Sequence, residues 1–143
     1  MPPWTGFFDN SGTPCLRIWI SGPFAPAQEF DAVLDTGFAG FLSMPLVRAF
    51  PLGLMLHGIT DVVLADGSVH DKLAAKATIT VDKEARTDVA ILEPGSNEVL
   101  VGIDFLRIFK RILLLDSGRK VELWSRADFD ATFGATPQQP PRL

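Results

Sequence analysis

An aspartate, a threonine and a glycine that follow an apolar stretch are the residues of this sequence best suited to chemistry. The stretch Asp31 to Leu34 places the carboxylate of Asp35 on a turn, with the hydroxyl of Thr36 and the flexible backbone of Gly37 directly after it. A positioned carboxylate can accept a proton from water or, once protonated, donate one. The same three residues also form an ordinary polar turn after a strand, so the surrounding sequence must decide between the two interpretations.

A second apolar stretch that ends in a glycine lies later in the chain. Val99 to Ile103 predicts a short strand that contains Gly102, and Asp104 opens a predicted helix over 104–111. We expect Asp104 to be structural, because its oxygen can accept a first-turn N–H group and Arg107 lies within reach of it.

The basic residues of the predicted helix form a cluster. Arg107, Lys110 and Arg111 lie three and four residues apart. This spacing predicts that all three lie on the solvated face of that helix.

The elements that must position these residues are mostly strands. Alternation of apolar and polar residues, or short apolar runs, predicts strands over residues 15–20, 29–34, 59–64, 69–81, 87–92, 99–103, 112–116 and 120–124. Residues 21–27 contain a glycine and two prolines and predict a loop, and 45–50 predict a short helix. Asp66-Gly67, between two β-rich segments, is a strong hairpin signal.

This order of elements predicts one mainly β domain, a barrel or a sandwich, without alternating β-α-β units. The chain has 143 residues, which fits a single domain. We place an N-terminal arm at 1–13, the domain at 14–126 and a C-terminal tail at 127–143, with a flexible Pro-rich end.

Composition excludes several classes of protein. The net charge is −4 and the 13 basic residues are spread along the chain, which argues against a nucleic-acid partner. Cys15 is the only cysteine and cannot form an internal disulfide, so we expect a cytoplasmic location and a buried thiol. No apolar run approaches the ~20 residues that a membrane helix needs, so we expect no membrane partner.

The sequence resembles the retropepsin-like aspartic proteases, single-lobe enzymes that include the retroviral proteases. The resemblance rests on Asp35-Thr36-Gly37, on the later hairpin with a glycine at its tip, and on Val101-Gly102-Ile103 before a helix. The form Asp-Thr-Gly-Phe-x-Gly-x-Leu is similar to a prokaryotic subgroup of aspartyl protease-like proteins. The resemblance implies a closed acid-protease β-barrel with one short C-terminal helix.

The resemblance also implies the chemistry. Two aspartates that share one proton activate a water molecule and protonate the peptide group. Asp35 is then the catalytic residue, and Thr36 and Gly37 support the active-site loop. Asp116-Ser117-Gly118 is the other candidate motif, but only 81 positions separate it from Asp35, so we interpret it as a surface turn. The active species is therefore expected to be a homodimer with one Asp35 from each subunit.

Two further parts of the expected site follow from the same resemblance. Ala65, Asp66, Gly67 and Ser68 are expected to form the flap that covers the substrate, although an ordinary hairpin turn explains them equally well. Phe38 stands where related enzymes carry a small or hydroxyl residue, and we expect it to pack into the barrel or to narrow the cleft. Gly102 and Asp104 are expected to support the site structurally.

The leading hypothesis is thus an aspartic endopeptidase that acts on a peptide or protein substrate without a cofactor or metal. His57 and His70 lack the spacing of a metal site. One alternative is a catalytically silent dimer of the same fold that serves as a binding or assembly module. Another is an unrelated small β-barrel in which Asp35-Thr36-Gly37 is only a turn, and a strict monomer would favour it.

Overall fold

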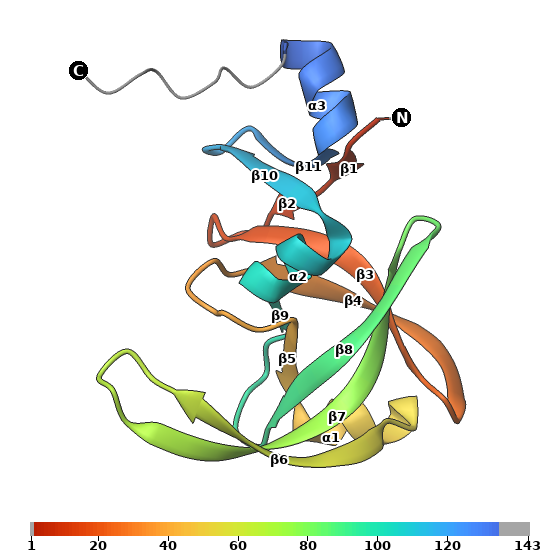
Figure 1. Ribbon diagram of the computed structural model, residues 1–143, viewed down its shortest axis with the longest axis vertical. Helices are drawn as coiled ribbons and strands as arrows, with labels where there is room; N and C mark the ends of the chain where they lie inside the picture. The colour runs from red at the N-terminus through yellow and green to blue at the C-terminus, as the bar shows by residue number, and fades with distance from the viewer. Residues whose placement is uncertain (1, 135–143) are drawn as a thin grey trace, which may run out of the picture.

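The computed structural model describes residues 2–134, and most of its elements are strands (Figure 1). The strands are Trp4–Thr5 (β1), Phe7–Phe8 (β2), Pro14–Gly22 (β3), Ala25–Leu34 (β4), Leu42–Pro45 (β5), Met55–Val63 (β6), Val69–Val81 (β7), Glu84–Glu93 (β8), Leu100–Val101 (β9), Arg111–Asp116 (β10) and Lys120–Ser125 (β11). The helices are Leu46–Ala49 (α1), the 3₁₀ turn Phe50–Leu52 (η1), Ile103–Phe109 (α2) and Arg126–Phe133 (α3). The expectation of a mainly β protein with a short helix near its C-terminus is confirmed.

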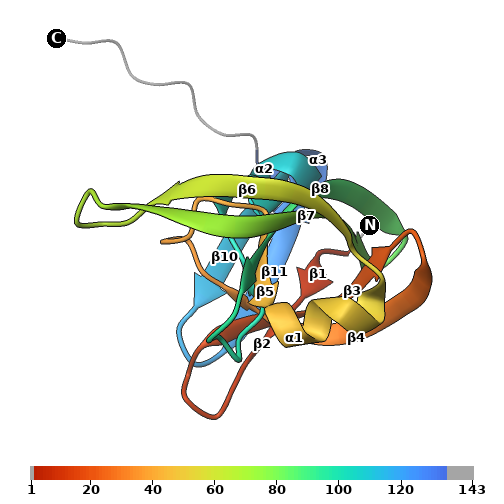
Figure 2. The ribbon, with the colours of Figure 1, turned by 90° about the horizontal axis from the view of Figure 1, so that it is seen from below.

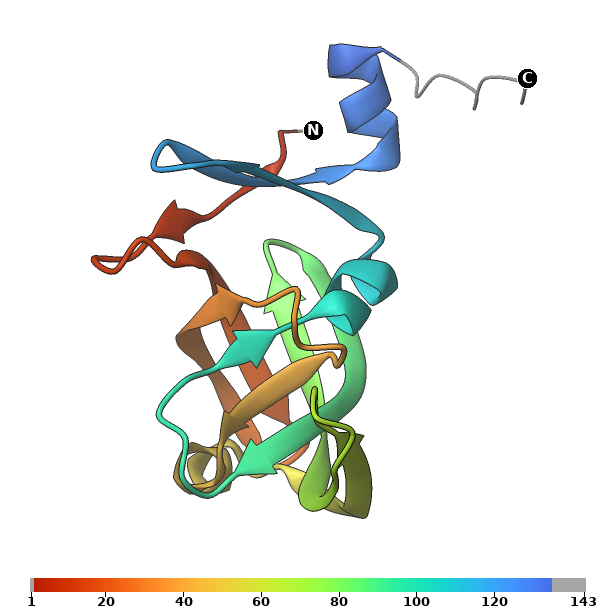
Figure 3. The same cartoon turned by 90° about the vertical axis from the view of Figure 1, so that its left-hand side faces the viewer.

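Two sheets make up the fold. The larger has eight strands in the order β2-β3-β4-β9-β5-β8-β7-β6, and β3 also pairs with β7. The pairings therefore run from β3 through β4, β9, β5, β8 and β7 and return to β3. The smaller sheet has the order β1-β11-β10 and lies with α3 beyond one end of the larger sheet (Figure 3).

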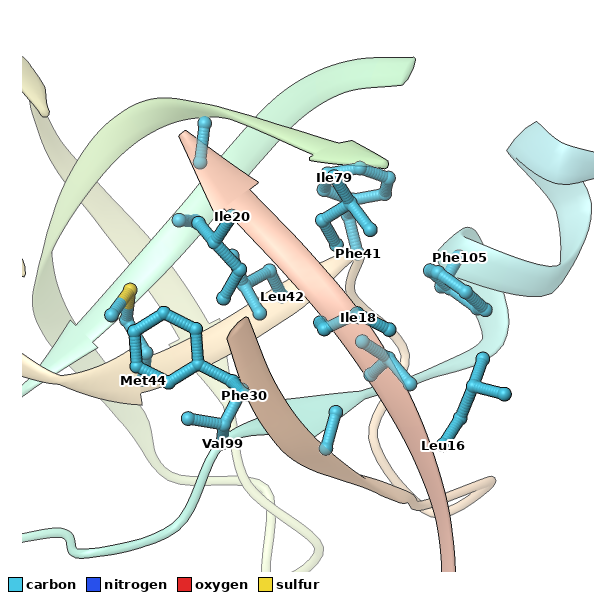
Figure 4. Close-up of a cluster of buried hydrophobic side chains, with 14 of the residues drawn as sticks. Leu16, Ile18, Ile20, Phe30, Phe41, Leu42, Met44, Ile79, Val99 and Phe105 are labelled. Atoms are coloured by element: carbon cyan, nitrogen blue, oxygen red, sulfur yellow. The ribbon is translucent and has the colours of Figure 1, made fainter. Parts of the chain in front are cut away.

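The core lies between the strands of the larger sheet and α2. Leu16, Ile18 and Ile20 alternate along β3 and are all buried, as the sequence pattern predicted. Figure 4 shows Ile18 and Ile20 in the same buried cluster as Phe41 and Phe105. The side chain of Phe105 anchors α2 to this core, so the helix that follows Gly102 has a fixed position.

The predicted loop over 21–27 is wrong, because the connection in the structure is shorter. Strand β3 continues to Gly22 and β4 begins at Ala25, so only two residues connect them. Pro26 fits inside β4 because the register of the hairpin shifts between Ile20 and Gly22, and such an irregularity tolerates a residue without an N–H group.

The ends of the chain contain more structure than the sequence predicted. Within the segment taken as an N-terminal arm, β1 pairs with β11 and β2 pairs with β3. Helix α3 begins at Arg126, the last residue assigned to the domain, and continues to Phe133 within the segment taken as a tail. The side chain of Ser125 caps it by accepting a hydrogen bond from the backbone N–H of Asp128. The Pro-rich end that we expected to be flexible lies outside the described residues.

The β6–β7 hairpin projects from the body of the protein (Figure 2). Its two strands pair from Met55 opposite Lys76 to Val63 opposite Val69, with an irregularity between Leu56 and Gly58. Within residues 2–134, no helix has the length and apolar character needed to cross a membrane.

Candidate active site

The backbone of Asp35 is fixed by a parallel pairing of two strands. Strand β4 pairs with β9, with Val33 opposite Leu100 and Leu34 opposite Val101. The ladder extends one residue further, because the backbone N–H of Asp35 donates to the carbonyl oxygen of Val101 at 2.9 Å. The two motifs found in the sequence therefore lie next to each other.

The carboxylate of Asp35 accepts a hydrogen bond from its own loop. The backbone N–H of Gly37 donates to Oδ1 of Asp35 at 2.9 Å, and the N–H of Phe38 donates to the carbonyl oxygen of Asp35 at 3.1 Å. A β-carbon at position 37 would lie 3.1 Å from Oδ1, so a glycine leaves that oxygen accessible. Asp35 is half-buried and Thr36 is exposed, so the Asp35 loop lies at the surface of the chain.

The loop after Asp35 is hydrogen-bonded to the start of α2. The N–H of Ile103 donates to the carbonyl oxygen of Phe38 at 2.9 Å, and the N–H of Asp104 donates to that of Ala39 at 3.1 Å. The first N–H groups of a helix have no partner within the helix, so this loop satisfies two of them. Figure 3 shows the β4–β5 loop beside the start of α2.

A cavity of about 650 Å³ separates this loop from the β6–β7 hairpin and β8. It is lined by Gly37, Phe38, Ala39, Gly40, Phe41, Thr60, Asp61, Val62, Val63, Leu64, Ala65, Asp88, Val89, Ile91 and Asp104. The charged residues of this lining are all acidic. Asp35 and Thr36 lie beside the cavity and are not part of its lining. They border a separate small gap, together with Gly102 and Leu106, and this gap has no room for a water molecule.

The residues predicted to form the flap are divided between the cavity and the hairpin tip. Ala65 lines the cavity, whereas Asp66, Gly67 and Ser68 form the tight turn beyond it. Oδ1 of Asp66 accepts hydrogen bonds from the hydroxyl and the backbone N–H of Ser68, and these bonds lower the pKa of Asp66. Gly67 has a φ of 86°, which favours glycine. The predicted hairpin is confirmed, and its role as a flap stays a prediction.

Two carboxylates face each other across the same hairpin. Asp61, which lines the cavity, pairs in register with Asp71. A hydrogen bond that the protonated Asp61 donates to the carboxylate of Asp71, with a smaller contribution from the charge of Asp71, raises the pKa of Asp61. The hairpin therefore carries a proton-sensitive pair on the side that borders the cavity.

The ring of Phe38 folds back over two glycines. A β-carbon added at Gly40 or at Gly102 would collide with this ring. The ring also lines the cavity, so Phe38 both packs against the loop and forms a wall of the cleft. Its presence leaves the volume of about 650 Å³ open.

Asp104 was expected to pair with Arg107 and to cap the helix, and the structure shows only the first of these roles. Its carboxylate accepts from Nη2 of Arg107 at 3.0 Å, which confirms the expected charge pair. The expected helix cap is wrong, because Gly102 is the N-cap of α2 and makes no side-chain hydrogen bond. Asp104 also lines the cavity.

The other two sequence interpretations have clear outcomes. Asp116-Ser117-Gly118 lies in the β10–β11 turn, where the N–H of Arg119 donates to the carbonyl oxygen of Asp116 at 2.9 Å. This confirms the interpretation as a surface turn. Cys15 is only 4% exposed, as expected of a buried thiol. In the described part of the chain, no three His, Cys, Asp or Glu side chains gather closely enough to hold a metal ion.

Sequence reasoning missed the far wall of the cavity. Residues 60–63 come from β6, Leu64 follows that strand, and Asp88, Val89 and Ile91 come from β8. Asp88 carried a usable signal, because it occupies the same side of β8 as the buried residues Ala90 and Leu92. A half-buried acid in such a row indicates a polar opening in the core.

No protein family matches the chain, and no curated protein matches it.

Proposed function

We propose that the chain is one subunit of a homodimeric aspartic endopeptidase with a retropepsin-like fold. The main support is the position of Asp35. Its carboxylate accepts from Gly37 on a loop that is fixed to β9 and α2, beside a cavity that the β6–β7 hairpin closes from the other side. A peptide in that cavity would lie along the hairpin, with its scissile bond near Asp35.

The strand order supports the fold that this function requires. The pairings that return from β7 to β3 support the proposal of a closed barrel, in which β6–β7 would be the flap and α2 the helix after the second motif. The short Val101-Gly102 segment pairs beside Asp35, which is the arrangement the resemblance implies.

The proposed reaction needs two carboxylates that share one proton. The ionised Asp35 accepts a proton from water, which attacks the peptide carbonyl carbon, while the protonated Asp35 of the second subunit donates its proton to the carbonyl oxygen. Collapse of the tetrahedral intermediate returns a proton to the leaving nitrogen. One chain supplies one such loop, so we infer that the second carboxylate comes from a second copy across a twofold axis.

The proposed location is the cytoplasm. Cys15 is free and buried, so no disulfide stabilises the fold. A reducing compartment suits such a protein.

A second candidate is a catalytically silent dimer that binds a peptide in the same cavity. It is favoured by the placement of Phe38, whose ring forms part of the cavity wall while Asp35 lies outside the lining. In this case the protein would bind peptides without cleaving them.

Incubation with a peptide library between about pH 3 and pH 8 separates the two candidates. The endopeptidase predicts cleavage by the wild type that is highest at mildly acidic pH and is lost in Asp35→Asn. The matched control is Asp116→Asn, the same substitution in the exposed β10–β11 turn, which should cleave like the wild type. Cleavage by Asp35→Asn at the wild-type rate would contradict the mechanism, and peptide binding without cleavage would favour the silent module.

A further inference from the structure

A second hollow, of about 340 Å³, lies between α2, the start of β10 and the start of α3. It is lined by Ile103, Leu106, Arg107, Lys110, Arg111, Ile112 and Arg126. Four of these seven residues are cationic and the others are aliphatic, although the whole chain has a net charge of −4. A concentration of basic side chains on an acidic protein indicates an anionic ligand.

Local backbone structure brings the four cations together. Helix α2 ends at Phe109, and its C-cap residue Lys110 takes a left-handed conformation with a φ of 55° and turns the chain into β10. Arg111 begins β10 and lies in register opposite Ser125, the last residue of β11. Arg126 therefore follows directly beside Arg111, at the first position of α3.

Arg111 is the most unusual member of this group. The sequence predicted it on a solvated helix face, but its side chain is only 9% exposed. Its guanidinium lies 3.8 Å from the centroid of the Trp4 ring and forms an ion pair with Glu84. Its Nε is buried and has no hydrogen-bond partner among the described residues. A buried donor without an acceptor is costly, and the side chain that carries it lines the hollow.

Arg107 keeps hydrogen-bonding capacity for a ligand. It pairs with Asp104 at 3.0 Å, and Arg126 pairs with Asp130 at 3.5 Å, each on its own helix. The guanidinium of Arg107 has five N–H donors in a planar fork, so one carboxylate does not use them all. Neither of the two acidic partners lines the hollow.

We propose that this hollow binds the phosphate group of a small organic phosphate. Guanidinium groups hold phosphate oxygens with paired hydrogen bonds, and an ammonium group such as that of Lys110 adds charge. The aliphatic side chains of Ile103, Leu106 and Ile112 offer a surface for the carbon part of the ligand. This assignment is independent of the proposed peptidase activity, because it uses no residue of the Asp35 loop.

The test is a titration of the full chain, followed through backbone amide resonances, with phenyl phosphate, inorganic phosphate, benzoate and phenol as probes. We expect phenyl phosphate to shift the amides of residues 103–112 and 125–127, with binding that weakens as salt increases. Equal affinity for inorganic phosphate would support the oxyanion site and assign it to the free ion. Benzoate binding as tightly as phenyl phosphate, or phenol causing the same shifts, would overturn the proposal.

Two variants locate the site. Lys110→Asn retains a residue that tolerates the left-handed conformation, and Arg126→Gln retains the helix start; each should weaken phenyl phosphate binding about fivefold to tenfold. The control is Arg119→Gln, which removes a cation that pairs with a nearby carboxylate, Asp116, but lies in the β10–β11 turn. Affinity that falls equally in all three variants would show a general charge effect and would contradict the proposal.

Discussion

Gly102 lies directly against the backbone carbonyl oxygen of Phe38. A β-carbon at position 102 would collide with that oxygen and would stand 2.8 Å from the carbonyl oxygen of Gly40. The same oxygen of Phe38 accepts the N–H of Ile103, so neither partner can move without breaking that bond. The glycine of the second motif is therefore what allows the Asp35 loop to rest on the start of α2.

This contact predicts that Gly102→Ala destabilises the protein. Overpacking against backbone atoms should lower the free energy of unfolding by about 1–3 kcal/mol, measured by urea denaturation. Gly95→Ala is the control, because a β-carbon there meets nothing within 4 Å, and it should change stability by less than about 0.5 kcal/mol. Equal stability of the two variants would show that the Phe38 contact is not a constraint.

Cys15 should make the protein sensitive to alkali. Burial, and then the charges of Asp9, Asp31 and Glu98, raise the pKa of the Cys15 thiol above its ordinary value of 9.0. Since the folded state holds this proton more tightly than the unfolded state, the thiol's contribution to stability is complete below pH 9.0 and is lost as the pH rises through the raised value.

The corresponding experiment compares wild type with Cys15→Ala by urea denaturation across the alkaline range. The wild type should lose stability relative to the variant as the pH passes above 9.0, whereas any cost of the missing sulfur is the same at every pH. A difference between the two proteins that does not depend on pH would mean that the thiol is not shielded.

The facing carboxylates of Asp61 and Asp71 should loosen the β6–β7 hairpin at neutral pH. The pKa of Asp61 is raised by its hydrogen bond with Asp71 and by the charge of that residue. Its contribution to stability is therefore present below its ordinary value of 3.8 and is lost as the pH rises through the raised value. Like charges opposite each other in an antiparallel pair are unfavourable.

Asp71→Asn should therefore increase protection from hydrogen exchange along β6 and β7 at neutral pH, and the difference from wild type should disappear at about pH 3. Asp82→Asn, in the turn between β7 and β8, removes the same charge without changing the pair and should leave the exchange of β6 unchanged. Equal protection in the two variants would indicate that the pair does not control the hairpin.

The strands and turns that depend only on neighbouring residues could be predicted from the sequence. Alternation located β7 at residues 69–81, and Asp66-Gly67 located its turn, because strand period and turn chemistry are properties of neighbouring residues. The two-residue β3–β4 connection escaped prediction because Pro26 is an ordinary loop signal, and only the register shift in the pairing accommodates it. The short strands β1 and β2 exist through pairing with distant strands, which no local pattern encodes.

In the candidate site too, local motifs identified some residues, whereas others are brought in only by tertiary packing. The sequence identified Asp35, Gly37, Gly102 and Asp104, and the structure brings them together through the β4–β9 pairing. The far wall of the cavity and the burial of Arg111 depend on tertiary packing. Arg111 was placed on a helix face by its spacing from Arg107, but the left-handed conformation of Lys110 ends the helix at Phe109, two residues before Arg111.

The central claim is that catalysis needs one Asp35 from each of two chains, and mixing subunits tests it most directly. Asp35→Asn is added to a fixed amount of wild type, subunits are allowed to exchange, and peptide cleavage is measured per wild-type chain. With random pairing, an equal mixture should retain about half of the activity per wild-type chain, because only wild-type pairs hold two Asp35 carboxylates. Activity per wild-type chain that stays constant as the variant is added would contradict the shared site.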